Sequence, residues 1–225
     1  MKATVFASIL WVAVAVAQQQ TPYELYLSAK DGNAGALEEL KARAQQGVAR
    51  AQDSLAFMYQ RGEGVPKDPI QAAVWYRKAA EQGDAFGEFN LGWMYREGNG
   101  VLKDFVQAVA WYRKAAEQGF AQSQANLGRM YGSGEGVAKD AGQAAVWYRK
   151  AAEQGLADGQ TGLALAYSAG EGVPKDLVTA YMWANLAAAQ GNEMSKEARD
   201  AWEKQMTPAQ IAEGQKLSRE WKPKQ

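Results

Sequence analysis

A nine-residue string recurs along this chain at a constant interval of 36 residues. It reads Trp-Tyr-Arg-Lys-Ala-Ala-Glu-Gln-Gly, begins at Trp75, Trp111 and Trp147 without change, and begins again at Trp183 in a degenerate form. A fixed period in this range is typical of stacked repeats, each of which packs only on its neighbours. The period therefore predicts four repeats: repeat one (49–84), repeat two (85–120), repeat three (121–156) and repeat four (157–192).

Each repeat carries the signals of two helices joined by a tight connector. In repeat one, residues at helical spacing run from Ala49 to Arg61. Gly62 follows at the position where a left-handed C-cap is expected. Asp68 then stands at the N-cap of a second helix, with Gln71 three residues later in the capping-box arrangement. The constant Trp, Tyr and Ala-Ala positions are interpreted as core. The sequence thus predicts an all-α fold, a superhelical solenoid of helix–turn–helix repeats.

The two ends of the chain depart from the period. Residues 18–48 lack the Gly-x-Gly connector and are interpreted as an N-terminal partial repeat or cap. Residues 193–225 lie beyond the last repeat and are interpreted as a C-terminal helical cap. Atypical ends are expected, because terminal repeats present a polar outer face.

The first 17 residues have the pattern of a secretory signal peptide. Lys2 precedes an apolar run that ends in Ala15-Val16-Ala17, and three glutamines follow. The run, from Val5, spans about 13 residues, shorter than the ~20 that a transmembrane helix needs. We expect cleavage after Ala17, a periplasmic or secreted location, and no stable membrane insertion of the mature chain. An uncleaved membrane anchor is the alternative interpretation.

Composition narrows the functional classes. The chain contains no His and no Cys, which excludes His-based and thiol nucleophiles, His- or Cys-ligated zinc, and disulfides. Lys and Arg together number 25, as do Asp and Glu, so no net charge draws the protein to nucleic acid. The carboxylate and Lys pairs in the connectors recur in every repeat, which favours a structural role. We therefore expect no catalytic site, no metal site and no cofactor.

The repeat pattern resembles a known family. It combines a first-helix segment, Leu91-Gly92-x-Met94-Tyr95, a connector ending in Lys103-Asp104, and a second-helix segment from Trp111 to Gly119. These residues resemble the Sel-one-like repeat family, a relative of the tetratricopeptide repeat, over about residues 22–192. The resemblance implies a right-handed α/α superhelix whose first helices line a concave face, and an adaptor or scaffold role. The tail from Met206 to Glu213 is similar to the ending of bacterial members, which often carry signal peptides.

A second branch of that family supplies an alternative function. Some secreted members are cysteine-rich and have been linked to penicillin binding or to β-lactamase-like activity. This chain has no Cys and departs from that branch. A peptidoglycan- or penicillin-binding envelope protein remains the alternative to a protein-interaction scaffold.

Comparison of the four repeats with one another suggests a binding surface. Positions 50, 53, 57, 60 and 61 and their equivalents in the later repeats vary, and their spacing places them on one side of the first helix. This variable stripe combines aromatic residues with Arg, the composition of interface hot spots. The alternative is that Phe57 and Phe89 pack between adjacent repeats. We predict that a monomeric chain binds an unidentified protein or peptide through Arg50, Phe57, Phe89, Asn90, Trp93, Arg96, Asn126 and Arg129.

Overall fold

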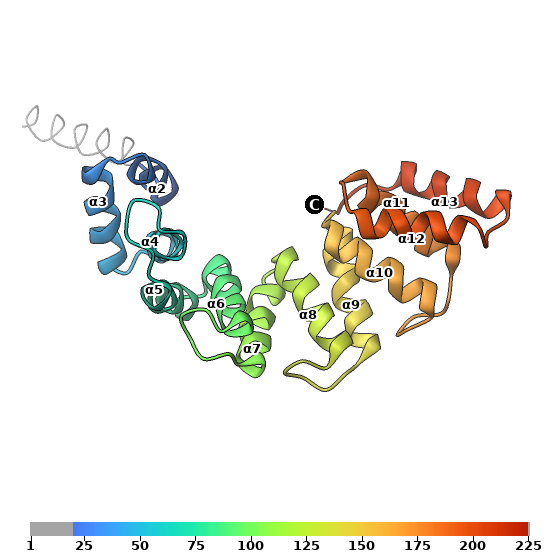
Figure 1. The fold of residues 1–225 in the computed structure, drawn as a ribbon, viewed down its shortest axis with the longest axis horizontal. Coiled ribbons are helices and arrows are strands. Elements are labelled where there is room, and N and C mark those ends of the chain that lie inside the picture. The colour runs from blue at the N-terminus through green and yellow to red at the C-terminus, as the bar shows by residue number, and fades with distance from the viewer. Residues whose placement is uncertain (1–19, 225) are drawn as a thin grey trace, which may run out of the picture. The chain divides into compact units, whose positions relative to one another are not determined.

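The structure is a computed structural model that describes residues 20–224 (Figure 1). Within that range it contains twelve α-helices and no β-strand, which confirms the predicted all-α repeat fold. The chain divides into an N-terminal unit that ends at Gln82 and a C-terminal unit that begins at Gly83. The predicted signal peptide, residues 1–17, lies outside the described residues.

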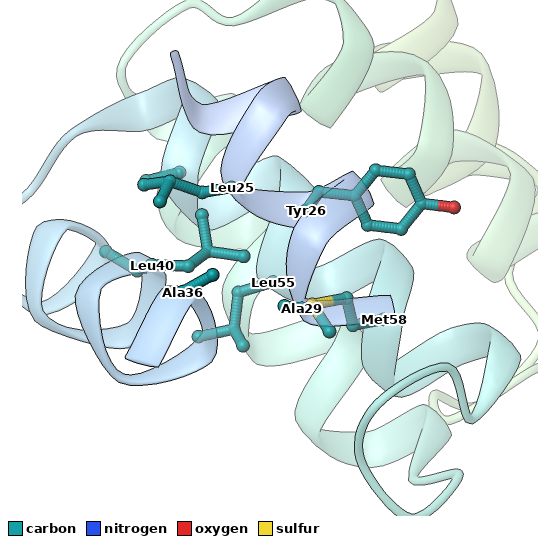
Figure 2. Packing of buried hydrophobic residues seen from close by; sticks show 9 residues of the cluster. Leu25, Tyr26, Ala29, Ala36, Leu40, Leu55 and Met58 are labelled. Atoms are coloured by element: carbon teal, nitrogen blue, oxygen red, sulfur yellow. The ribbon is translucent and has the colours of Figure 1, made fainter. Parts of the chain in front are cut away.

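The N-terminal unit consists of four helices: α2 (Pro22–Lys30), α3 (Ala34–Gln45), α4 (Ala49–Arg61) and α5 (Pro69–Glu81). Leu25, Leu40 and Leu55 come from α2, α3 and α4 and meet in a buried cluster (Figure 2). The hydroxyl of Tyr26 donates to Glu63 Oε2 at 2.6 Å, across from α2 to the connector that follows α4. The segment interpreted as a partial repeat thus forms a helix pair whose apolar face is covered by repeat one.

The C-terminal unit holds the remaining eight helices. Repeats two to four supply α6 (Ala85–Glu97), α7 (Phe105–Glu117), α8 (Ala121–Ser133), α9 (Ala141–Glu153), α10 (Ala157–Ala169) and α11 (Leu177–Ala189). The tail forms α12 (Glu193–Glu203) and α13 (Pro208–Glu220), and both pack on α11. Trp221 meets Trp183 edge-on, with ring centroids 5.8 Å apart. The tail therefore covers the apolar face that repeat four would otherwise expose.

The helix ends follow the sequence signals, with one difference. Gly62 ends α4 in the left-handed conformation (φ 76°), and Asp68 begins α5 by accepting hydrogen bonds from the backbone N–H groups of Ile70 and Gln71. Among the described hydrogen bonds, the Gln71 side chain does not return the bond that a capping box requires. The complete box forms at α13, where Thr207 N donates to the side chain of Gln210 at 2.9 Å.

The connectors lie very close to the second helix of the preceding repeat. Gly136 has φ +69°, and a Cβ built on it would lie 2.2 Å from the carbonyl oxygen of Phe105, the first residue of α7. A Cβ on Gly172 would lie 2.0 Å from the carbonyl oxygen of Ala141, the first residue of α9. No side chain fits at either position, so glycine is required by both the backbone angle and the contact.

Glutamine side chains link successive repeats through their buried helix ends. Gln124 Nε2 donates to the carbonyl oxygen of Ala116 at 3.1 Å, and Gln154 Nε2 donates to Gln124 Oε1 at 2.8 Å. In the next repeat, Gln190 Nε2 donates to Gln160 Oε1 at 2.9 Å. Because a buried backbone group without a partner is costly, this ladder stabilises the stacking of repeats.

Repeat two places a carboxyl group in the ladder. Glu88 occupies the position of Gln52 and Gln124 and is 3% exposed. Burial raises the pKa of this carboxyl group, against the opposing effects of the Lys114 charge and of a 2.8 Å hydrogen bond from Gln118 Nε2. The folded chain therefore disfavours the ionised form of Glu88 more than the unfolded chain does.

The connector contact leads to a stability prediction. Gly136→Ala should lower the free energy of unfolding by about 2 kcal/mol or more, because it combines a left-handed backbone with a clash. Gly119→Ala is the matched control: Gly119 has φ +92°, but nothing lies within 4 Å of its Cβ position, so only the backbone term applies. That term is about 1 kcal/mol. Urea denaturation of both variants checks this, and equal losses would show that the connector contact is not close.

Glu88 leads to a pH-dependent prediction. Because its folded pKa is raised, the carboxyl group lowers stability as pH increases from the unfolded pKa through the folded one. Glu88→Gln, which restores the ladder residue of the other repeats, should stabilise the chain more at about pH 7 than at about pH 4. Urea denaturation of variant and parent at both pH values measures the difference. An equal effect at both values would contradict a pKa of Glu88 that burial raises in the folded chain.

Candidate functional site

In the N-terminal unit, the variable stripe contributes partly to packing. Phe57 is half-buried, meets Tyr26 edge-on at 5.6 Å, and packs against the cluster of α2, α3 and α4. The guanidinium of Arg61 lies 5.3 Å from the centroid of the Phe57 ring. Arg50 is exposed. The Phe57 ring therefore helps to hold the N-terminal cap on repeat one.

In the C-terminal unit, the predicted aromatic site residues are also half-buried. Phe89 lies 5.9 Å from Tyr112 and 5.2 Å from Phe120, ring centroid to ring centroid. Trp93 packs against the core cluster that contains Tyr112. Asn90 is half-buried as well. Substitutions at Phe89 or Trp93 would therefore disturb the core together with any binding surface.

The predicted polar residues bond to one another. Asn126 Nδ2 donates to the carbonyl oxygen of Gln122 at 2.8 Å, and its Oδ1 accepts from Arg96 Nη1 at 2.8 Å. Arg129 Nη2 lies 3.5 Å from the same Oδ1. Arg96 Nε also donates to Glu97 at 2.6 Å. The amide of Asn126 is thus engaged within the protein, whereas Arg129 makes only one long contact.

Helices α8, α9 and α10 pack on one another in the C-terminal unit (Figure 1). Their side chains, with the connector residue Glu171, line a groove of about 470 Å³. Half of the residues that line it occupy the variable stripe: Arg129, Gly132, Ser133, Leu165, Ser168 and Ala169. The others are Ala141, Ala144, Tyr148, Gly162, Ala166 and Glu171. The lining is thus mainly apolar, with a cation, a carboxylate and three hydroxyl groups.

The groove exists because repeat three lacks a side chain that earlier repeats carry. Gly132 stands at the position of Gln60 in repeat one and Arg96 in repeat two. A Cβ built on Gly132 would meet only the Ala144 side chain, at 3.8 Å, so the space above it is open. Gln60 fills the equivalent space in repeat one, where its Oε1 accepts from the Tyr76 hydroxyl at 2.8 Å.

The ring of Tyr148 lies between two glycines of neighbouring repeats. A Cβ on Gly128 would lie 2.8 Å from the Tyr148 ring, and a Cβ on Gly162 would lie 2.5 Å from it. Gly162 replaces Asn90 and Asn126 of the earlier repeats. These glycines let α8 and α10 approach α9 closely, so that the half-buried ring forms part of the groove.

Charge is distributed unevenly in the groove. Burial raises the pKa of Tyr148, the charge of Arg129 opposes that shift, and Asp158 adds to it, so the hydroxyl stays protonated at neutral pH. Among residues 20–224, no acidic side chain forms an ion pair with Arg129. Glu171 lines the groove in the connector after α10.

Of the eight predicted site residues, Arg129 lines this groove. Sequence reasoning missed Gly132, Tyr148, Gly162 and Glu171. A signal was present, since Gly132 replaces two long polar side chains at a variable position. The prediction instead gave weight to the aromatic residues of the stripe, such as Phe89 and Trp93, and gave none to the loss of a side chain at Gly132.

The described part of the chain has no cluster typical of a metal site and no candidate membrane span. Between residues 20 and 224, no three Asp or Glu side chains gather closely enough to hold a metal ion. None of the helices there has the length and apolar character needed to cross a bilayer.

Two solved structures resemble this chain at more than 30% sequence identity. A protective antigen of uropathogenic Escherichia coli strains, described as displaying an SLR fold, is 36% identical with a TM-score of 0.77, and the match covers 88% of this chain and 45% of that one. This chain thus spans less than half of that antigen. A Sel1 repeat protein from Oxalobacter formigenes is 33% identical with a TM-score of 0.75, covering 90% of this chain and 85% of that one.

A more distant structure shares the fold alone. An immunity protein from Pseudomonas aeruginosa is 21% identical with a TM-score of 0.52, covering 90% of this chain and 80% of that one. No curated protein matches the chain. The family model described as Sel1 repeat matches residues 49–84, 85–120, 121–156 and 157–192. These matches cover more than half of the sequence, and the chain belongs to the Sel1 repeat family, whose members are generally protein-interaction scaffolds.

Proposed function

We propose that this chain is a scaffold that binds a partner protein by holding an extended segment of it in the groove between α8, α9 and α10. One observation carries the proposal. The groove is lined by stripe positions that differ from repeat to repeat, such as Gly132 and Leu165, whereas the positions that hold the stack are nearly constant. Side chains that are free of a packing role are the ones available for recognition.

The size and lining of the groove fit this role. Its volume of about 470 Å³ lies within the range of ligand-binding clefts, which are mostly apolar with a few polar groups that fix orientation. Ala144, Leu165 and Ala166 provide apolar walls, and Ser133 and Ser168 provide hydroxyl groups at the edge. A peptide segment with one or two apolar side chains matches such a surface.

We also propose that the interaction takes place outside the cytoplasm, in the periplasm or after secretion. The apolar run that ends at Ala17 supports this, as does the lack of Cys, since a chain without thiols cannot mispair under oxidising conditions.

Filling the groove should abolish binding. A photoreactive amino acid placed at Ser168 should crosslink one defined partner in the cells that make this protein. Gly132→Trp should lower that capture by about tenfold or more, because the added ring occupies the cleft. Helix content should be retained, since replacing a helical glycine removes a residue of poor helix propensity.

The matched control is Ala138→Trp, which adds the same ring at an exposed connector position that does not line the groove. It should leave capture unchanged. The proposal is wrong if Gly132→Trp folds and still captures the same partner, or if Ser168 captures nothing that a probe at exposed Gln143 does not.

Export is tested by the N-terminus of the protein itself. The chain expressed from its full sequence in a bacterium with a secretory pathway should be recovered outside the cytoplasm with Gln18 as its first residue. Intact-mass measurement with N-terminal sequencing checks this. Recovery of a cytoplasmic chain that begins at Met1 would overturn the proposed location.

A further inference from the structure

Arg129 is an unusual residue for its place in the repeat. The equivalent positions hold Phe57, Trp93 and Leu165, all apolar, and only repeat three has a charge there. The guanidinium lines the groove, is exposed, and makes one long contact of 3.5 Å to Asn126 Oδ1. That oxygen already accepts a shorter bond from Arg96. Within the described chain, no carboxylate forms an ion pair with Arg129, and Asp158 acts on the neighbouring Tyr148 without such a pair.

The tyrosine beside it lacks an acceptor. In repeat one, Tyr76 donates its hydroxyl proton to Gln60. Tyr148 is the equivalent residue in repeat three, but the position of Gln60 is taken there by Gly132. No described residue forms a hydrogen bond with the Tyr148 hydroxyl. The groove thus presents a hydroxyl donor without a described acceptor, and a guanidinium donor whose described contact is the long one to Asn126 Oδ1.

Repeat two shows that the region around Arg129 is rich in donors. The hydroxyl of Tyr112 is buried and has no described hydrogen-bond partner. Burial raises its pKa, and the charges of Arg96 and Arg129 both oppose that rise. Arg96 is neutralised by Glu97 at 2.5 Å, whereas Arg129 has no such neighbour. Arg129 is therefore the cation in this region that remains available to a ligand.

The rest of the groove fixes where a ligand anion can lie. Glu171 lies next to Gly172, which packs on Ala141 at the beginning of α9, whereas Tyr148 lies two helical turns further along that helix. Two turns correspond to about 11 Å. Glu171 repels a carboxylate at its end of the groove. At the Tyr148 end the charges of Arg129 and Asp158 oppose each other, so a carboxylate there depends on direct hydrogen bonds from Arg129 and from the Tyr148 hydroxyl.

From these contacts we infer that the groove selects a partner segment with an Asp or Glu side chain, whose carboxylate accepts hydrogen bonds from Arg129 and from the Tyr148 hydroxyl. The inference rests on the proposed function, and it names the chemistry of the partner. An apolar side chain next to that acidic residue lies against Ala144 and Leu165. Arginine suits this role because its planar fork matches a carboxylate, and charge-assisted hydrogen bonds are the strong ones.

The test is selection from a random dodecapeptide library displayed on phage, with the full chain as bait. Peptides retained by the parent should carry Asp or Glu at a fixed distance from an apolar residue. A synthetic copy in which that acid becomes Asn or Gln should bind about tenfold to a hundredfold more weakly, the fold-change expected for a hydrogen bond to a charged group.

Variants of the chain then test whether Arg129 and the Tyr148 hydroxyl are the groups that donate to the peptide carboxylate. Arg129→Leu introduces the residue of repeat four, should fold, and should bind the acidic and the amide peptide about equally. Gly132→Gln introduces the residue of repeat one, which supplies an acceptor to Tyr148 and should also reduce the preference for acid. Arg219→Leu, an equal loss of charge at an exposed position of α13, is the control and should retain the full preference.

The outcomes separate this inference from the proposed function. Peptides that depend on the groove, as shown by loss of binding to Gly132→Trp, but that carry no acidic residue would overturn the inference and leave the scaffold proposal standing. An acid preference that survives in Arg129→Leu would also overturn it. If no peptide is enriched on the parent, both proposals fail.

Discussion

The close approach of the connectors of repeats three and four to the second helix of the preceding repeat sets the geometry of the C-terminal unit. In the C-terminal unit, Gly136 and Gly172 bring the connector backbone so near a carbonyl oxygen of the preceding second helix that no Cβ fits. This contact fixes the displacement between these repeats, and at that displacement Gln154 Nε2 and Gln190 Nε2 donate to the carbonyl oxygens of Gly119 and Gly155 in the preceding repeat. A residue that serves such a contact must recur every 36 positions, which is why the sequence period is so regular.

The groove arises where the repeat pattern is incomplete. Gln60 occupies the space above the second-helix tyrosine in repeat one, and Gly132 leaves it open in repeat three. The floor of the groove is still provided by Tyr148, whose ring is held between Gly128 and Gly162. The same residues that stack the repeats thus form a rigid base, and the variable stripe determines what that base exposes. In one helix pair, the variable stripe thus provides the residues for recognition, and the constant positions provide the residues that stabilise the stack.

The helices were predictable from the sequence because their signals are local and repeated. Gly62 and Asp68 mark the end of one helix and the beginning of the next by backbone preference and capping, which need no knowledge of neighbours. The binding surface was less predictable because exposure depends on neighbours far along the chain. Phe89 and Trp93 lie on the variable stripe, yet their large rings reach Phe120 and the core, and packing leaves them half-buried. Only alignment of the repeats on one another shows that Gly132 removes a side chain.

Because the chain has no net charge, recognition of a partner depends on individual charged groups such as Arg129. With equal numbers of acidic and basic residues, no long-range field attracts a partner, so recognition must depend on contacts. Most arginines of the repeats have acceptors: Arg96 pairs with Glu97, and Arg149 donates to the Tyr167 hydroxyl at 2.9 Å. Arg129 has none of comparable quality among the described residues. The fold does not require a charge at this position, since Phe57, Trp93 and Leu165 occupy the equivalent positions of the other repeats. The charge is explained if an anion from outside the chain completes the site, because the guanidinium is already held at the groove before that anion binds.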